Sequence, residues 1–184
     1  MPESGYTLFE TPVGRLGIAW KGDVLAGIHL PASGGDRSGP GMSRRFPGVE
    51  ERRPPKWVEG AIESICGLLG GVHADLSAIP LDLAAVGAFE ASVYRASQAI
   101  PPGCTVTYGE LATRIGDRGA ARAVGQALGR NPWPIVVPCH RVTAADGRFG
   151  GFSAPGGIST KRRLLEIEGA FSVDRLPLFA PPLK

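Results

Sequence analysis

Cys139 is the residue of this 184-residue chain whose surroundings most suggest chemistry. Pro138 precedes it, and His140 and Arg141 follow it directly. A cysteine attacks as its thiolate, and a nearby imidazole or cation favours that form. Adjacent side chains often point apart, so the pair alone fits a core cysteine beside a surface histidine equally well. The neighbourhood favours a reactive thiol, because Asn131 comes shortly before the pair and a glycine-rich loop follows it.

The cysteines and histidines of the chain are too scattered to form disulfides or a metal site. The cysteines Cys66, Cys104 and Cys139 are widely spaced and odd in number, which does not fit a disulfide framework. No C-x₂₋₄-C pair occurs and the three histidines are far apart, so we expect no structural zinc site. Free thiols are typical of a reducing, cytoplasmic compartment. Cys66 lies in an apolar helical run and is interpreted as a buried hydrophobe.

The charges are unevenly divided along the chain. Residues 1–84 hold 8 Lys and Arg against 10 Asp and Glu, whereas residues 85–184 hold 12 against 7. The net charges are therefore −2 and +5, and ten of the twelve cations in the second half are arginines. Arginine recognises phosphate through forked contacts. The asymmetry favours an anionic partner such as nucleic acid, and a solvated basic face explains it nearly as well.

Two short helices joined by a tight glycine turn are predicted upstream of the Cys-His pair. Thr107 and Glu110 match the capping box, which satisfies the first amides of a helix over 108–115. A second helix over 120–129 is rich in alanine and glycine and carries Arg122. Such a pair predicts a helix-turn-helix, and the small side chains of its second helix allow another molecule to approach closely.

The segments around Cys139 are predicted from their composition. Residues 135–137 are apolar β-formers and predict a buried strand. The segments 141–143 and 148–149 flank an Asp-Gly turn signal, which predicts a hairpin able to act as a wing. A final helix is predicted over 160–169, where a glycine ends the apolar pattern.

The first half of the chain predicts a small sheet covered by helices. Its first thirty residues read as a β-meander with a glycine-containing hairpin loop. Residues 31–56 predict a surface loop with at most a short helix, and 57–69 predict an amphipathic helix. Residues 79–83 predict a short edge strand, and 89–100 predict a further amphipathic helix.

The whole chain is therefore expected to be an α+β protein. Apolar residues make up 43% and charged residues 20%, a globular composition. Pattern and charge change near residue 85, which predicts an N-terminal domain over 1–85, a second domain over 86–170 and a proline-rich tail over 171–184. No run is long and apolar enough for a membrane span and no secretory signal is visible, so we expect no membrane association. We expect a monomer.

The run from Asn131 to Val142 resembles the N-P-x-x-I-x-I-P-C-H-R-V signature of the O6-alkylguanine-DNA alkyltransferases, also called methylated-DNA–protein-cysteine methyltransferases. The resemblance is dense over about 86–170. It extends through Ile100-Pro101-Pro102-Gly103-x-x-x-Thr107-Tyr108, Leu111-Ala112, Ala121-Arg122-Ala123-Val124-Gly125 and Lys161-x-x-Leu164-Leu165-x-x-Glu168-Gly169. It implies an N-terminal RNase H-like domain followed by a winged helix-turn-helix domain that binds DNA and carries the catalytic residues.

The resemblance implies repair of alkylated double-stranded DNA. Cys139 is expected to take the alkyl group from O6 of guanine, or less efficiently from O4 of thymine, in one irreversible step. His140 is expected to act as base on the thiol through a bridging water, and Glu168 to orient His140. Asn131 is expected to support the active-site turn. No cofactor or metal is implied.

The resemblance also implies residues that contact DNA and the flipped base. Arg122 is expected to fill the space that the base leaves, and Tyr108 to push the 3′ phosphate. The remaining expected DNA contacts are Ala121, Gly125 and Arg141, and the expected pocket residues are Pro138, Val142, Phe152 and Ser153. The family usually has tyrosine at the position of Phe152, and Ala154-Pro155 are extra residues, so the pocket lid is expected to differ in shape.

Three other classes of protein compete with this interpretation. An alkyltransferase-like module that binds lesions without repairing them carries another residue in place of the nucleophile, and Cys139 argues against it. A helix-turn-helix regulator needs long polar side chains on its second helix, which 120–129 lacks. A Cys-His hydrolase is disfavoured because no glycine-flanked nucleophile elbow precedes the cysteine.

Overall fold

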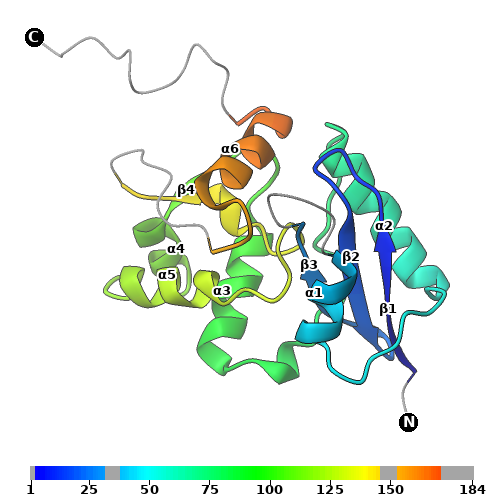
Figure 1. Cartoon of the computed structure of the whole chain (residues 1–184). Coiled ribbons are helices and arrows are strands. Elements are labelled where there is room, and N and C mark those ends of the chain that lie inside the picture. Colours follow the sequence, from blue (N-terminus) through cyan, green and yellow to red (C-terminus); the bar gives the residue numbers. More distant parts are fainter. Residues whose placement is uncertain (1–2, 32–37, 146–152, 171–184) are drawn as a thin grey trace, which may run out of the picture.

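The computed structural model describes residues 3–31, 38–145 and 153–170. Its N-terminal part holds three strands and two helices: β1 (Ser4–Phe9), β2 (Leu16–Lys21), β3 (Val24–His29), α1 (Ser38–Arg45) and α2 (Lys56–Leu69). The rest is built from η1 (Leu83–Ala85), α3 (Ala88–Gln98), β4 (Val106–Thr107), α4 (Tyr108–Arg114), α5 (Ala121–Gly129), η2 (Cys139–Arg141), β5 (Val142–Thr143) and α6 (Gly157–Ile167), where η1 and η2 are 3₁₀ turns. The strands β1 to β3 with α2 lie on one side of the molecule and α3 to α6 on the other (Figure 1).

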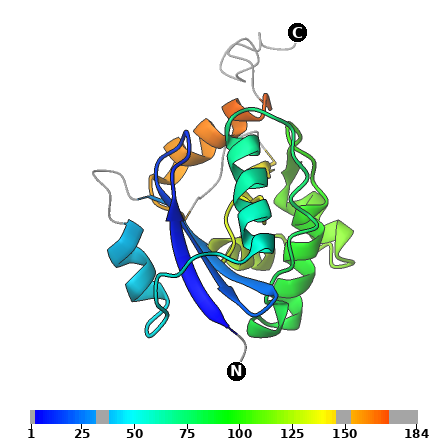
Figure 2. The same cartoon turned by 90° about the vertical axis from the view of Figure 1, so that its right-hand side faces the viewer.

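The predicted meander is confirmed as an antiparallel sheet in the order β1-β2-β3. Side chains of one face, such as Leu16 and Ile18, join the main core together with the apolar stripe of α2. Ala19 points to the other face and packs with Met42 of α1. The helices α1 and α2 therefore cover opposite faces of the sheet, as Figure 2 shows.

The predicted helices of the second half are also confirmed, with small shifts of their ends. The capping box holds: the Glu110 amide donates to Thr107 Oγ1 over 3.1 Å, and the Thr107 amide donates to the Glu110 carboxylate over 2.6 Å. It places Tyr108 at the first position of α4. The final helix begins at Gly157, before the predicted residue 160.

Two predicted strands are wrong. Residues 79–83 make only one isolated bridge, between Leu81 and Leu25, because the chain turns into η1 directly afterwards. Residues 135–137 are buried as expected but form a turn, in which Ile135 has a φ of 78°. Of the predicted wing, 142–143 form β5, which pairs in parallel with β4, and 148–149 lie outside the described residues.

Trp133 joins the two parts of the molecule. The residue is 1% exposed, its Nε1 donates to the Leu25 carbonyl of β3 over 2.7 Å, and the Tyr94 ring of α3 packs edge-on against its ring at 5.7 Å between centroids. The Tyr94 hydroxyl in turn donates to the Ala127 carbonyl of α5 over 2.9 Å. One continuous apolar core therefore links the sheet to the helices that surround Cys139. No helix of the described ranges is long and apolar enough to cross a membrane.

Candidate active site

A tight turn presents Cys139. The Asn131 side chain bridges this turn: its Nδ2 donates to the Val137 carbonyl over 2.9 Å, and its Oδ1 accepts from the Trp133 amide over 2.9 Å. Ile135 sits inside the turn at positive φ, a conformation that a β-branched residue adopts only when its surroundings enforce it. Asn131 and the buried core together therefore fix the backbone just before the cysteine.

The Cys139 thiol is nearly buried, with 8% of the residue exposed. Burial raises its pKa, and this effect outweighs a hydrogen bond with Asn131 and the charge of Lys161, which both act to lower it. The resting side chain is thus a neutral thiol that needs a base before it can attack.

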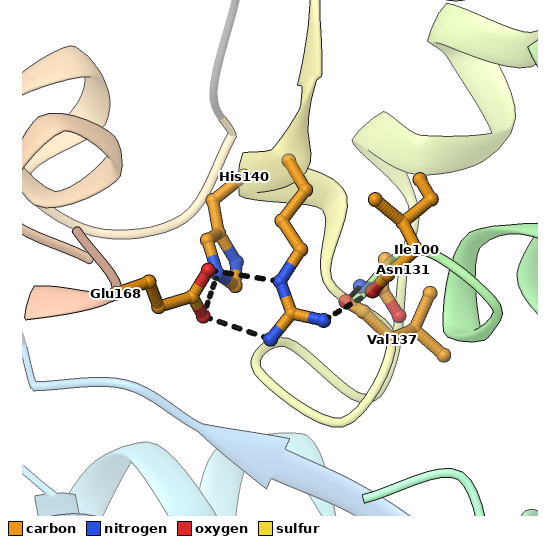
Figure 3. Close-up of polar contacts among 6 residues, drawn as sticks. Ile100, Asn131, Val137, His140 and Glu168 are labelled. Carbon is orange, nitrogen blue, oxygen red and sulfur yellow. Dashed lines mark hydrogen bonds and ion pairs between the residues drawn. The ribbon is translucent and has the colours of Figure 1, made fainter. Parts of the chain in front are cut away.

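His140, Arg141 and Glu168 form one buried hydrogen-bonded cluster. Figure 3 shows the side chains of His140 and Glu168 pointing toward one another. His140 Nε2 lies 2.8 Å from Glu168 Oε1. The Arg141 guanidinium donates to both oxygens of the same carboxylate, from Nε over 2.9 Å and from Nη2 over 2.8 Å. Its Nη1 donates to the Ile100 carbonyl over 2.5 Å. A forked pair of this kind fixes orientation as well as charge.

The charges of this cluster determine which nitrogen of His140 can accept a proton. Burial acts to raise the pKa of Glu168, but hydrogen bonds from His140 and Arg141 prevail and hold it at about 2. Burial lowers the pKa of His140, so its imidazole is neutral. Because a carboxylate only accepts hydrogen bonds, His140 Nε2 carries the proton and Nδ1 carries the free lone pair. Nδ1 is buried and has no hydrogen-bond partner among the described residues.

The end of α6 places Glu168 in this cluster. Gly169 follows at a φ of 71°, its amide donates to the Glu166 carbonyl over 3.1 Å, and the Ala170 amide donates to the Leu165 carbonyl over 2.9 Å. This is the Schellman ending, which favours glycine. A carboxylate at a helix C-terminus faces the negative end of the helix dipole, so Glu168 does not serve the helix itself. Its position is explained by its bonds to His140 and Arg141.

A cavity of about 850 Å³ opens beside Cys139 between α4, α5 and the segment after η2. This volume is typical of sites that enclose a small organic ring system. The described residues that line it are mostly small or lie at the rim: Tyr108, Gly109, Ala121, Arg122, Gly125, Gln126, Leu128, Gly129, Cys139, Ala144, Ala145 and Ser153. A Cβ at position 125 would lie 3.7 Å from the Tyr108 ring, so α5 and Tyr108 are already in contact.

Comparison with known proteins identifies the family. A family model, 6-O-methylguanine DNA methyltransferase, DNA binding domain, matches residues 88–170. A methylated-DNA–protein-cysteine methyltransferase of Mycolicibacterium paratuberculosis is 37% identical over 95% of this chain and 98% of its own length. The chain belongs to the methylated-DNA–protein-cysteine methyltransferase family.

Among solved structures, Mycobacterium tuberculosis OGT in complex with DNA matches 89% of this chain and 92% of its own, with a TM-score of 0.71 and 37% identity. The O6-methylguanine-DNA methyltransferase of Pyrococcus kodakaraensis matches at a TM-score of 0.64 and 31% identity.

In this member of the methyltransferase family, most of the residues expected in the site do lie together. Cys139, His140, Glu168 and Asn131 form one connected group, although Glu168 is 28 residues from His140 in the chain. The expected DNA-contact residues Tyr108, Ala121, Arg122 and Gly125 all line the cavity, as does Ser153 of the expected pocket. The Ser153 hydroxyl donates to the Gly129 carbonyl at the end of α5 over 2.7 Å.

Three expected positions are corrected by the structure. Arg141 is only 5% exposed and binds Glu168, so it belongs to the buried cluster and not to a DNA-binding surface. Val142 is 0% exposed because β5 is packed inside the core, and Pro138 is likewise buried, so neither lines the cavity. Phe152 lies outside the described residues.

Sequence reasoning missed Lys161 as a site residue, although it belongs to the motif that ends α6. Its side chain is completely buried and its charge acts on Cys139. The signal available in the sequence was weak, because a lysine on a helix followed by two arginines looks like part of a solvated face. The described residues hold no group of three His, Cys, Asp or Glu side chains that could bind a metal ion.

Proposed function

We propose that this protein repairs double-stranded DNA by transferring the alkyl group of O6-alkylguanine, and less efficiently of O4-alkylthymine, to its own Cys139. The observation that carries the proposal is a buried thiol at the edge of a cavity, next to an imidazole whose free Nδ1 is the proton-accepting nitrogen. Family membership supports the reaction class.

The proposed chemistry is one displacement. Cys139 Sγ gives its proton to His140 Nδ1, through a bridging water, and the sulfur then attacks the alkyl carbon. The bond between that carbon and O6 breaks, its electron pair stays with guanine, and His140 returns the proton to the base. Glu168 stabilises the transient imidazolium through Nε2. A thioether is not hydrolysed in water, so each molecule acts once.

We propose that the lesion reaches Cys139 by rotation out of the duplex. Arg122 is exposed at the cavity rim and is suited to fill the vacated space, and Tyr108 beside it is suited to press on the adjacent phosphate. With its small residues Ala121 and Gly125, α5 can approach the minor groove closely. Minor-groove contact reads sequence weakly, which suits a protein that must search all sequences.

We propose that the chain consists of two domains and a tail. We infer an RNase H-like N-terminal domain over 1–85 and a winged helix-turn-helix domain over 86–170, in which α4 and α5 form the helix pair. The proline-rich tail expected over 171–184 lies outside the described residues. The contact between α4 and α5 and the capping box at Thr107 support the helix pair. The shared core argues that the two domains fold as one unit.

Intact-protein mass after incubation with a duplex that carries O6-methylguanine tests the proposal. We expect a gain of one methyl group, mapped to the peptide of Cys139, and repaired product equal to active protein when lesion is in excess. Activity should persist in a chelator. An unchanged mass with tight lesion binding would instead identify a module that binds lesions without repairing them, and a methyl on Cys66 or Cys104 would refute the assignment of the nucleophile.

A further inference from the structure

Lys161 is a buried cation that the proposed mechanism does not use. It lies on the inner face of α6 with no exposed surface, and its Nζ donates to the Val142 carbonyl of β5 over 2.5 Å. The same ammonium lies 6.0 Å from the centroid of the Tyr108 ring. Among the residues that the structure describes, no carboxylate forms an ion pair with it.

A buried ammonium without a counter-charge is costly, and proteins retain few of them. The cost is visible in its pKa, which burial lowers to about 8, while the charge of Cys139 acts in the opposite direction. Arg141 presents the contrast, since its charge is matched by Glu168 through two hydrogen bonds. The charges of Glu168 and Arg141 cancel, so among the described buried residues of the site Lys161 carries the excess positive charge.

The groups around Lys161 indicate which negative charge it is suited to meet. Tyr108 faces it from α4, and Cys139 and His140 interact with its charge from η2. Neutral His140 carries no negative charge, and burial raises the pKa of the Tyr108 hydroxyl. The group that becomes negative during alkyl transfer is the Cys139 sulfur.

We propose that Lys161 is a positioning residue that stabilises the thiolate of Cys139 at the moment of attack. This proposal rests on the proposed function. When the proton moves from Sγ to His140 Nδ1, two charges appear in a buried space. The imidazolium is stabilised by Glu168, 2.8 Å from Nε2, and the thiolate is stabilised by the positive charge of Lys161. Lys161 keeps its proton throughout.

Two variants separate charge from shape. Lys161→Met keeps the length of the side chain without its charge, and Lys161→Arg keeps the charge. We expect the methionine variant to raise the pKa of Cys139 by about one unit, which lowers the thiolate fraction and the rate at neutral pH about tenfold. We expect the arginine variant to stay closer to the wild type than the methionine variant does.

Two rates are measured as a function of pH. The first is the rate at which iodoacetamide modifies Cys139, monitored by the mass of the Cys139 peptide. The second is the rate of single-turnover alkyl transfer from a methylated duplex. A shift of both profiles to higher pH in Lys161→Met, with the rates recovering at alkaline pH, supports the proposal. A lower Tm with unshifted profiles would show that Lys161 only holds β5 in place, and unchanged rates would also overturn the proposal.

The iodoacetamide profile keeps this test separate from the test of function. If the wild type removes no methyl group from DNA, the proposed function fails, while the ionisation of Cys139 still reports on Lys161. If Lys161→Met does not fold, Lys161→Arg is compared with the wild type instead. Because arginine keeps the positive charge, a rise of one unit in the pKa of Cys139 in this variant would overturn the proposal that the charge stabilises the thiolate.

Discussion

The two walls of the region around Cys139 are built in opposite ways. Behind the thiol, His140, Arg141 and Glu168 are at most 6% exposed and are tied to one another by hydrogen bonds. On the α5 side, small residues line the cavity and Arg122 projects into solvent. Fixed, buried dipoles suit proton transfer, because their geometry and low dielectric surroundings strengthen each interaction. An open face of small residues suits contact with a large and variable partner.

Removing the nucleophile should give the largest effect, because it affects alkyl transfer and leaves DNA binding unchanged. We expect Cys139→Ala to abolish alkyl transfer and to leave binding to lesion-containing duplex intact, because the α5 face is unchanged. Intact-protein mass and a gel-shift titration measure the two properties. Cys104→Ala, at an exposed cysteine, is the matched control and should retain transfer. A methyl group gained by the Cys139→Ala protein would refute the assignment.

Glu168→Gln should damage the buried wall alone. It leaves the Arg141 guanidinium buried without its counter-charge, which we expect to cost about 3 kcal/mol of unfolding free energy. It also removes the charge that stabilises the imidazolium, so transfer should slow on the order of a hundredfold. Urea unfolding and single-turnover rates test both. The exposed carboxylate of Glu166, paired with Arg162 on the same helix, supplies the control Glu166→Gln, which should change stability by less than about 1 kcal/mol.

Acid should weaken the same wall in a defined pH window. The pKa of Glu168 is about 2 in the folded protein against an ordinary value of 4.5. A carboxylate with a depressed pKa stabilises the fold above its unfolded pKa, and this stabilisation is lost as the pH falls from 4.5 towards 2. We expect it to amount to about 3 kcal/mol. Urea unfolding of wild type and Glu168→Gln across this window should converge, and a constant difference between them would contradict the shift.

Arg122→Ala should damage the exposed wall alone. Extruding a base costs a few kcal/mol of stacking and pairing, which the guanidinium is suited to offset in part. We therefore expect repair of a duplex to slow about tenfold, since each 1.4 kcal/mol corresponds to one factor of ten. Reaction with free O6-benzylguanine should not change, if that base enters the cavity. Arg53→Ala, at an arginine whose side chain is 92% exposed on the N-terminal part, is the control. Equal slowing on both substrates would place Arg122 in the framework of the cavity.

The smallest effect is expected from loss of the N-terminal cap of α4. Thr107→Ala removes the cap of α4, the helix that begins with Tyr108, and should lower the unfolding free energy by about 1 kcal/mol. Transfer rates should fall only slightly, because the core still holds the helix. Thr113→Ala on the same helix, whose hydroxyl only bonds back to Gly109, should have a smaller effect on stability. Equal losses from both changes would show that the capping box is dispensable.

Features that depend on neighbours along the chain were predictable from the sequence. Local hydrogen-bonding residues predicted the capping box at Thr107, and apolar periodicity predicted the helix over 57–69. Both are confirmed. The motif around Cys139 was sufficient to indicate the family. The segment 135–137 was misjudged, because apolar residues describe burial and not conformation, and here Asn131 and the core impose a turn.

Features that depend on which groups share a buried space were decided only by the tertiary structure. Arg141 follows a histidine and Lys161 precedes two arginines, and nothing local distinguishes either cation from a surface residue. The fold brings Glu168 to Arg141, whereas no carboxylate of the described residues forms an ion pair with Lys161, so one charge is neutralised and the other acts on Cys139. The sequence determined which residues are present at the site, and the packing of α6 against η2 determined their charge environment, because electrostatic energies in the interior depend on distance and burial and not on chain order.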